Sequence, residues 1–126
     1  MTVRPSLAVL AVLAWLGPVA GGDAAALYYV VDGDTLYMGA EKIRILGIDA
    51  PETHPSHCAN EARLGKQATD RLGALLAAGP LKIERHGFDQ YGRTLAKITV
   101  GGVDVGAELV AERLAHVYVN HKLPWC

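Results

Sequence analysis

The stretch VVDGDTLYMGAEKIRILGIDAPE, residues 30–52, decides the fold, because short runs of β-branched and aromatic residues alternate in it with tight turns. The pattern predicts one strand over residues 26–32, a second over 35–38 and a third over 43–48. An Asp-Gly-Asp turn separates the first two strands, and a Gly-Ala-Glu-Lys turn precedes the third. Three short strands joined by tight turns predict an antiparallel meander.

The rest of the chain alternates between helical and strand patterns. Apolar residues recur at spacings of three and four until a Gly-Pro pair, which is typical of an amphipathic helix that ends there. The predicted elements are a helix over 60–78, strands over 81–86 and 93–100, a helix over 105–113 and an extended tail over 115–126. The order β-β-β-α-β-β-α is mainly β with helices (α+β) and predicts a five-stranded OB-fold Greek-key barrel.

Residues 1–22 have the pattern of a signal peptide: Arg4 is followed by an apolar run over 6–16 and then by small residues. The cleavage site is expected between residues 21 and 26. The apolar run is shorter than the roughly 18 residues of a membrane span, and an uncleaved N-terminal anchor is the alternative. The sequence therefore predicts an exported protein, periplasmic or secreted, whose mature part, residues 23–126, is a single domain.

The predicted mature part has nearly balanced charge. It holds 11 Lys and Arg residues against 13 Asp and Glu residues, a formal charge of about −2. That balance argues against a protein that binds nucleic acid through bulk positive charge. Any recognition of phosphate must therefore come from a local cluster of basic residues.

The chain has two cysteines, Cys58 and Cys126. In an exported protein two cysteines favour one disulfide, while two free thiols are the alternative. A third possibility is a zinc site formed by both cysteines with His54 and His57, although loop histidines are more often solvated. The remaining histidines are interpreted as structural or surface residues: His86, His116 and His121.

The carboxylates within residues 30–52 point to chemistry when taken together. Asp32 and Asp34 lie two apart and share a face of an extended chain, and Asp49 ends the neighbouring strand. Converging carboxylates suit a hard cation such as Ca²⁺. Each residue taken alone is more simply structural, because Asp-Gly pairs are ordinary turn residues. A regular strand would also put Arg44 and Asp49 on opposite faces, unless a bulge or a strand end separates them.

Two arginines and one further carboxylate complete the pattern. Arg44 lies between the aspartates in sequence, and Arg93 follows a Tyr-Gly loop. Guanidinium groups bind phosphate oxygens in a forked geometry. Glu52 is then free to orient or deprotonate water. A cation, two arginines and a spare carboxylate are the groups that phosphodiester hydrolysis requires.

Four segments resemble the staphylococcal nuclease (thermonuclease) family: VVDGDT, IRILGIDAPE, DQYGRTLAKI and VGAELVAERLA, which together span about residues 27–119. The resemblance implies an OB-fold barrel and a Ca²⁺-dependent endonuclease that cleaves DNA and RNA. In such an enzyme water attacks phosphorus and the P–O5′ bond breaks. Family members usually continue into a third charged helix, which is not expected in a chain that stops at Cys126.

The resemblance also implies roles for individual residues. Asp34 and Asp49 match the Ca²⁺-binding carboxylates, Ala50 the residue whose backbone carbonyl binds the ion, and Asp32 an acidic residue close to it. The implied catalytic residues are Arg44, Glu52 and Arg93, with Glu52 as general base. Tyr91 and Tyr118 match aromatic residues that contact the substrate. Gln90 stands where the family's best-known member has a lysine, which implies weaker binding of a terminal phosphate.

Two functions are compatible with this sequence. The first is a Ca²⁺-dependent endonuclease with DNA and RNA as substrates, expected to be a monomer without a stable protein partner. The second is a catalytically silent OB-fold module that binds nucleic acid or protein. The presence of the whole set of acidic and basic residues favours the nuclease.

Overall fold

The computed structural model describes residues 2–3 and 28–126, so the predicted signal peptide lies almost entirely outside the described residues. No described helix is both long enough and apolar enough to cross a membrane. The elements are β1 (Tyr28–Asp32), β2 (Thr35–Met38), β3 (Glu41–Ile45), β4 (Ile48–Asp49), α1 (Ala59–Ala77), β5 (Leu81–Phe88), β6 (Thr94–Val100), β7 (Val103–Asp104), α2 (Val105–Ala111) and β8 (His116–Val117).

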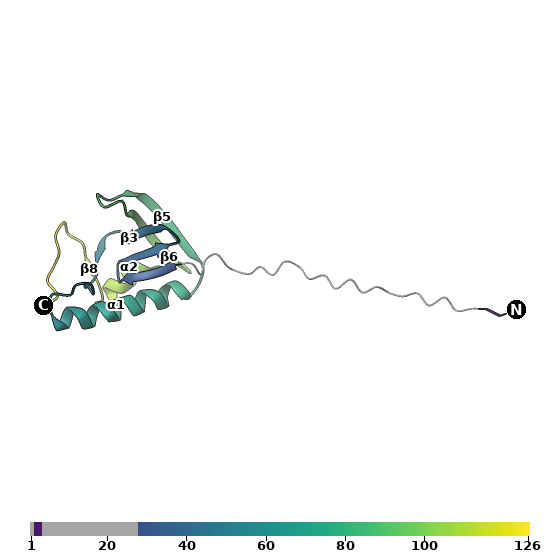
Figure 1. Cartoon of the computed structure of the whole chain (residues 1–126), viewed down its shortest axis with the longest axis horizontal. Helices are drawn as coiled ribbons and strands as arrows, with labels where there is room; N and C mark the ends of the chain where they lie inside the picture. Colours follow the sequence, from purple (N-terminus) through teal and green to yellow (C-terminus); the bar gives the residue numbers. More distant parts are fainter. Residues whose placement is uncertain (1, 4–27) are drawn as a thin grey trace.

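The main sheet runs in the order β1-β2-β3-β6-β5, with β7 paired to β6 (Figure 1). Strands β1, β2 and β3 pair antiparallel, which confirms the predicted meander. β6 joins this meander parallel to β3 and pairs antiparallel with β5. The mixed α+β architecture, with the first helix between the meander and the second pair of strands, confirms the predicted OB-like fold.

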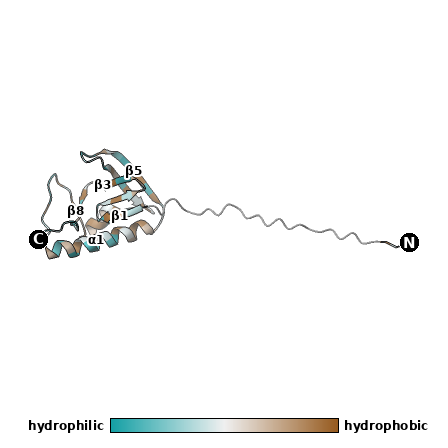
Figure 2. Ribbon diagram, viewed as in Figure 1, coloured by the Kyte–Doolittle hydropathy of each residue, from teal (hydrophilic) through white to brown (hydrophobic). Residues whose placement is uncertain are grey.

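The core follows from the periodicity of the strands and of helix α1. In β6 the side chains of Thr94, Ala96, Ile98 and Val100 are buried, and the residues between them are more exposed. Helix α1 buries Ala68, Leu72 and Leu76 at intervals of four, on the side that packs against β1 and α2. Figure 2 shows hydrophobic residues alternating with hydrophilic ones along this helix. Each fully buried leucine stabilises the fold by about 1.5–3 kcal/mol.

The third strand ends earlier than the sequence predicts. β3 stops at Ile45, the chain turns through Gly47 at a φ of +78°, and β4 begins at Ile48. Such a positive φ is readily adopted by glycine but is strained for other residues. The interruption reorients the chain. The side chains of Arg44 and Asp49 therefore lie near each other, although the two residues are five positions apart in sequence.

A second glycine brings the first turn of the meander close to helix α1. A Cβ atom on Gly33 would lie only 2.7 Å from the Cβ of Ala68 and 2.8 Å from that of Ala50. Only a residue without a side chain fits this space. Gly33 therefore lets the turn that carries Asp32 and Asp34 rest directly on the helix and on the residue after Asp49.

The predicted extended tail is partly paired. β8 pairs antiparallel with β4, and the segment after it, residues 118–126, we call the C-terminal tail. Its end is joined to the loop before α1 by a Cys58–Cys126 disulfide, and Trp125 stacks on His116 with ring centroids 3.7 Å apart. Since both sulfurs are in the disulfide, the cysteines cannot serve as the thiolate ligands of a zinc site.

Candidate active site

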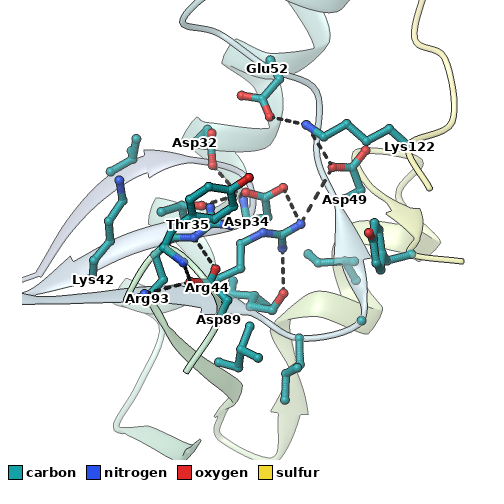
Figure 3. A pocket seen from close by; sticks show the side chains of 18 of the residues that line it. Asp32, Asp34, Thr35, Lys42, Arg44, Asp49, Glu52, Asp89, Arg93 and Lys122 are labelled. Carbon is teal, nitrogen blue, oxygen red and sulfur yellow. Dashed lines mark hydrogen bonds and ion pairs between the residues drawn. The ribbon is translucent and has the colours of Figure 1, made fainter. Parts of the chain in front are cut away.

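One pocket collects most of the residues that the sequence singles out. Its volume is about 640 Å³, and it is walled by the β1–β2 turn, by β3 and β4, by the loop before β6 and by the C-terminal tail. Figure 3 shows carboxylate and guanidinium groups that point toward one another across this pocket. The charged side chains that line it are Asp32, Asp34, Lys42, Arg44, Asp49, Glu52, Asp89, Arg93 and Lys122.

Asp34 is the most firmly held of these carboxylates. Its side chain is buried, and its Oδ1 accepts a hydrogen bond from the Thr35 hydroxyl at 2.8 Å. Its Oδ2 accepts a hydrogen bond from the backbone N–H of Ala50, also at 2.8 Å. This second bond ties the first turn of the meander to the end of β4. The two segments that carry the candidate cation ligands are therefore joined directly.

Arg44 lies between the two buried aspartates. Its Nη2 is 3.4 Å from Asp34 Oδ2 and 3.8 Å from Asp49 Oδ1, and its Nη1 donates to the carbonyl of Ile45 at 2.8 Å (Figure 3). The Arg44 side chain is only 15% exposed. A buried guanidinium group beside two buried carboxylates offsets part of their mutual repulsion. It also places a rigid, permanently charged donor at the floor of the pocket.

Asp49 has capacity for a further partner. The side chain is 3% exposed, and its Oδ1 has no hydrogen-bond partner among the described residues. Burial raises the pKa of Asp49, Lys122 opposes this rise, and Asp34 reinforces it. A buried carboxylate oxygen without a hydrogen bond is costly in free energy, so this atom is suited to an additional cation.

Asp32 carries the largest perturbation in the pocket. Burial and the neighbouring Asp34 carboxylate together raise the pKa of Asp32 to about 7. Its Oδ1 accepts a long hydrogen bond, 3.3 Å, from the backbone N–H of Asp34. Two neighbouring carboxylates disfavour simultaneous ionisation of both groups. A cation bound nearby would reverse this effect and favour the charged form of Asp32.

Glu52 faces the pocket from the segment after β4. Its Oε1 accepts a hydrogen bond from the ammonium group of Lys122 at 2.8 Å, and the Glu52 side chain is 31% exposed. The hydrogen bond with Glu52 raises the pKa of Lys122. Glu52 is thus a solvent-accessible carboxylate, whereas Asp34 and Asp49 are buried.

Arg93 is positioned by the loop before β6. Its Nε donates to Asp89 Oδ2 at 2.6 Å, and the other oxygen of Asp89 accepts from the backbone N–H groups of Tyr91 and Arg93. The guanidinium carbon lies 5.3 Å from the centre of the Tyr91 ring. Asp89 therefore organises the loop and orients the arginine at once. Tyr91 itself is 72% exposed, so its ring can contact a ligand.

The structure brings together all but one of the residues assigned from the sequence. The pocket lining includes Asp32, Asp34, Arg44, Asp49, Glu52, Tyr91, Arg93 and Tyr118. Ala50 is buried just behind this lining, where its N–H binds Asp34. Tyr118 is held by its backbone N–H, which donates to the carbonyl of Gly47 at 2.9 Å.

Three charged residues of the pocket were not assigned a role from the sequence: Lys42, Asp89 and Lys122. Asp89 lies inside the quoted DQYGRTLAKI segment, and an aspartate two residues before a Tyr-Gly turn is a signal for a turn-organising carboxylate. Lys122 gives no local signal, because its partner Glu52 lies 70 residues away in sequence. Only the fold of the C-terminal tail places this lysine at the pocket.

The donors present fit a hard divalent cation. Within residues 2–3 and 28–126, no three His, Cys, Asp or Glu side chains form a ready-made metal cluster. The observation that favours a cation is the buried Oδ1 of Asp49, which accepts no hydrogen bond from the described residues and has only ion-pair contacts at 3.8 Å with Arg44 and Lys122. The buried Asp34 carboxylate is joined to the same segment. Ca²⁺ is bound by carboxylates, backbone carbonyls and water together, so two aspartates need not complete its shell.

The arrangement can be compared with known proteins. The family described as staphylococcal nuclease homologue matches residues 42–124. Endonuclease YhcR of Bacillus subtilis (strain 168) is 40% identical over 102 residues, which is 71% of this chain and 8% of that protein. The SPbeta prophage-derived endonuclease YokF of the same organism is 39% identical over 95 residues, which is 69% of this chain and 31% of that protein.

A thermonuclease of Staphylococcus intermedius is 31% identical over 100 residues, which is 75% of this chain and 59% of that protein. The chain thus spans less than two thirds of the length of each of these relatives. The family match extends from β3 through helices α1 and α2 into the C-terminal tail. It contains five of the seven residues with an implied metal or catalytic role, and Asp32 and Asp34 lie before its start. Because this match covers well over half of the sequence, the chain belongs to the staphylococcal nuclease homologue family.

Proposed function

We propose that this protein is a nuclease, a hydrolase that cleaves the phosphodiester bonds of DNA and RNA as an endonuclease and depends on Ca²⁺. The observation that carries the proposal is the pairing of Asp34 and Asp49, both buried, with Arg44 between them at one end of a pocket that Glu52 and Arg93 also face. Burying like charges costs free energy, so the presence of two buried carboxylates favours a functional role for them.

The cation site consists of Asp34 and Asp49, with the backbone carbonyl of Ala50 as a third donor and Asp32 close by. When bound there, Ca²⁺ supplies positive charge that stabilises the developing negative charge on a phosphoryl oxygen. The bond from the Ala50 N–H to Asp34 fixes the spacing of the two ligand segments. The chain therefore holds both aspartates in place without requiring a large rearrangement on binding.

Arg44 and Arg93 recognise the scissile phosphate. The Arg44 side chain is only 15% exposed at the pocket floor, and Asp89 orients Arg93 in the same pocket. Two guanidinium groups that converge on one phosphate stabilise the extra negative charge of a pentacoordinate phosphorus. Both arginines act as electrostatic groups and not as acids.

Glu52 is the general base. It is accessible enough to meet a water molecule, yet it lies in the same pocket as both arginines. The oxygen of water forms a bond to phosphorus, Glu52 takes the proton of that water, and the bond from phosphorus to O5′ breaks. The leaving 5′ oxygen takes a proton from solvent and becomes a hydroxyl group, and Glu52 returns its proton to solvent. The phosphate stays on the 3′ oxygen of the other fragment.

The rim of the pocket suits a nucleotide. Tyr91 and Tyr118 are 72% and 45% exposed and line the same pocket. Exposed aromatic rings beside a phosphate site offer a stacking surface for bases and do not select one base strongly. Since the attack uses water and not the ribose 2′ hydroxyl, DNA and RNA are both substrates.

The cellular setting forms part of the proposal. The leader over residues 1–22 and the Cys58–Cys126 disulfide suit an exported protein, periplasmic or secreted. We propose a monomer without a stable protein partner. The formal charge of about −2 in the predicted mature part implies that substrate is held by the local cluster and not by a broad basic surface.

The test is cleavage of a single-stranded DNA oligonucleotide and of its RNA counterpart, with Ca²⁺ or with the chelator EGTA. We expect internal cleavage only with Ca²⁺, and products that carry 3′-phosphate and 5′-hydroxyl ends. RNA with methylated 2′ oxygens should be cleaved as well, because that oxygen takes no part in the attack. The control is heat stability in both buffers, which verifies that the protein remains folded.

The result that contradicts the proposal is a folded protein that binds the oligonucleotide and leaves it intact in Ca²⁺. That outcome would identify a catalytically silent OB-fold module. Products with 5′-phosphate ends would contradict the assignment of the broken bond while leaving the nuclease activity in place.

A further inference from the structure

Lys122 reaches the pocket from the C-terminal tail. Its ammonium nitrogen is 2.8 Å from Glu52 Oε1 and 3.8 Å from Asp49 Oδ1 (Figure 3). One cationic side chain therefore contacts both the proposed general base and a proposed cation ligand. No role was assigned to this lysine by the sequence reasoning.

Lys122 is held between two anchors. On one side the backbone N–H of Tyr118 donates to the carbonyl of Gly47. On the other side, Cys126 is bonded to Cys58, and the Trp125 carbonyl accepts a hydrogen bond from the Asn60 side chain at 2.9 Å. The stack of Trp125 on His116 closes the same loop. The tail is thus fixed at both ends while Lys122 projects from it toward the pocket.

The tether matters because the ion pair itself is weak. The Lys122 side chain is 62% exposed. Exposed ion pairs are screened by water and must restrain a long flexible side chain, so they contribute little on their own. A backbone fixed on both sides of the lysine reduces the number of places its ammonium group can reach. The two anchors therefore raise the local concentration of the ammonium group at Glu52.

The geometry points to a specific role, and we propose that Lys122 is a positioning residue: its ammonium group holds the Glu52 carboxylate in the pocket and, beside Asp49, lowers the affinity of the site for Ca²⁺. The part of this proposal that concerns Glu52 rests on the proposed function. The part that concerns Ca²⁺ affinity does not require catalysis.

This role predicts opposite effects on Ca²⁺ affinity and on kcat when Lys122 is replaced. Removing the ammonium group takes away a positive charge that repels a divalent cation, so Ca²⁺ should bind more tightly. The same change releases Glu52 from its partner, so a smaller fraction of carboxylates is oriented toward water and kcat should fall. A residue that merely stabilises the fold would not tighten Ca²⁺ binding while slowing turnover.

The experiment compares Lys122→Met, which keeps length and removes charge, with Lys122→Arg, which keeps charge. Lys82→Met is the matched control, because Lys82 lies in β5 outside the pocket and pairs with Glu84. Isothermal titration calorimetry without substrate measures the Kd for Ca²⁺. We expect Lys122→Met to lower this Kd by about two- to fivefold, Lys122→Arg to restore it, and Lys82→Met to leave it unchanged.

Steady-state cleavage of the DNA oligonucleotide supplies the second readout. At saturating Ca²⁺, Lys122→Met should lower kcat by about tenfold with KM changed less than about twofold. Lys122→Arg should recover most of the lost turnover. If the wild-type protein binds Ca²⁺ but does not cleave, the proposed function fails, and tighter Ca²⁺ binding by Lys122→Met still supports the contact with Asp49.

A second variant tests whether the tail acts through this lysine. The double substitution Cys58→Ala, Cys126→Ala removes the tether, so it should change the Ca²⁺ Kd and kcat in the same directions as Lys122→Met. Adding Lys122→Met to this double variant should then change neither the Ca²⁺ Kd nor kcat further, because both sets of changes interrupt the same contacts of Lys122. An unchanged Kd and kcat in folded Lys122→Met would overturn the proposal, as would full additivity in the triple variant.

Discussion

The meander and the C-terminal tail both place charged side chains in the same pocket, but different forces hold them there. In the meander, strand pairing fixes the register, as in the opposition of Thr35 and Arg44 on β2 and β3. Buried contacts then fix the side chains, as in the bond from the Ala50 N–H to Asp34. The acidic and arginine groups are thus built into the core of the fold.

The tail has few such contacts. Most of residues 118–126 are exposed, and their position depends on one disulfide, one aromatic stack and single hydrogen bonds. Because different contacts hold the two regions, catalytic turnover and stability of the fold can be altered separately. Changes at the sheet side of the pocket should affect turnover first, and changes at the tether should affect the free energy of unfolding first.

The largest effect is expected at Arg93. Arg93→Ala removes a charged donor that meets the transition state, so kcat should fall by about three orders of magnitude or more. The melting temperature should change little, because the Arg93 side chain is 26% exposed and its partner Asp89 keeps its bonds to two backbone N–H groups. Oligonucleotide cleavage and thermal unfolding measure the two quantities.

Arg85→Ala is the matched control, because Arg85 pairs with Glu41 on β3 and does not line the pocket. It should retain nearly full turnover. A loss of tenfold or less in Arg93→Ala would show that this arginine does not stabilise the transition state.

The second largest effect is expected at the tether. The disulfide joins residues 68 apart in sequence. In the chain-entropy model, closing a loop of this length stabilises the folded state by about 4 kcal/mol. Reduction of the purified protein should therefore lower the free energy of unfolding by roughly this amount, measured by urea denaturation with and without a reducing agent. Identical denaturation curves would mean that the tether does not stabilise the fold.

A smaller loss of activity is expected at Glu52. Glu52→Gln keeps the shape of the side chain and removes its ability to accept a proton, so kcat should fall by about two orders of magnitude. The Kd for Ca²⁺ should change little, since Asp34 and Asp49 remain. Calorimetric titration with Ca²⁺ separates the alternatives: if binding disappears in this variant, then Glu52 is a cation ligand and not the base.

The smallest effect concerns pH. The pKa of Asp32 is raised from 3.8 to about 7, so the folded protein binds a proton more tightly than the unfolded chain does. The free energy of unfolding should therefore fall as pH rises from about 4 to about 7 in the absence of divalent cations. After allowance for screening by solvent, the decline should be on the order of 1 kcal/mol.

Asp32→Asn keeps the oxygen that accepts from the Asp34 N–H and removes the ionisable group, so this variant should show a weaker decline. Urea denaturation at pH 5 and pH 8 in EDTA measures the difference. An equal decline in both proteins would assign it to other groups.

Local patterns in the sequence explain why the sheet side of the pocket could be predicted. The alternation of apolar residues predicts the strands, and two aspartates at strand ends indicate the proposed cation site. The end of β3 at Ile45 was not predictable from the same pattern, because an Ile-Leu-Gly-Ile run is compatible with a continuous strand. The positive φ of Gly47 lies just before β4, whose partner β8 comes from a distant part of the sequence.

The tail shows where such prediction stops. Its two cysteines indicate a bond, but no periodicity indicates that Lys122 will contact Glu52 or that Trp125 will stack on His116. These contacts form only after the chain has folded, and they depend on distances in space and not on spacing in sequence. The position of Arg44 between two aspartates likewise depends on the folded chain. It requires the turns of the meander and the turn at Gly47 that follows β3.

We propose that two buried aspartates form a cation site that activity requires, and the Asp49→Asn variant tests this site most directly. Isothermal titration calorimetry should detect one Ca²⁺ per wild-type chain and none at the same concentrations in Asp49→Asn, with cleavage lost in parallel. The variant should unfold at no lower a temperature than the wild type without Ca²⁺, because it removes a buried charge whose Oδ1 has no hydrogen-bond partner. Unchanged Ca²⁺ binding in a folded Asp49→Asn protein would contradict the claim.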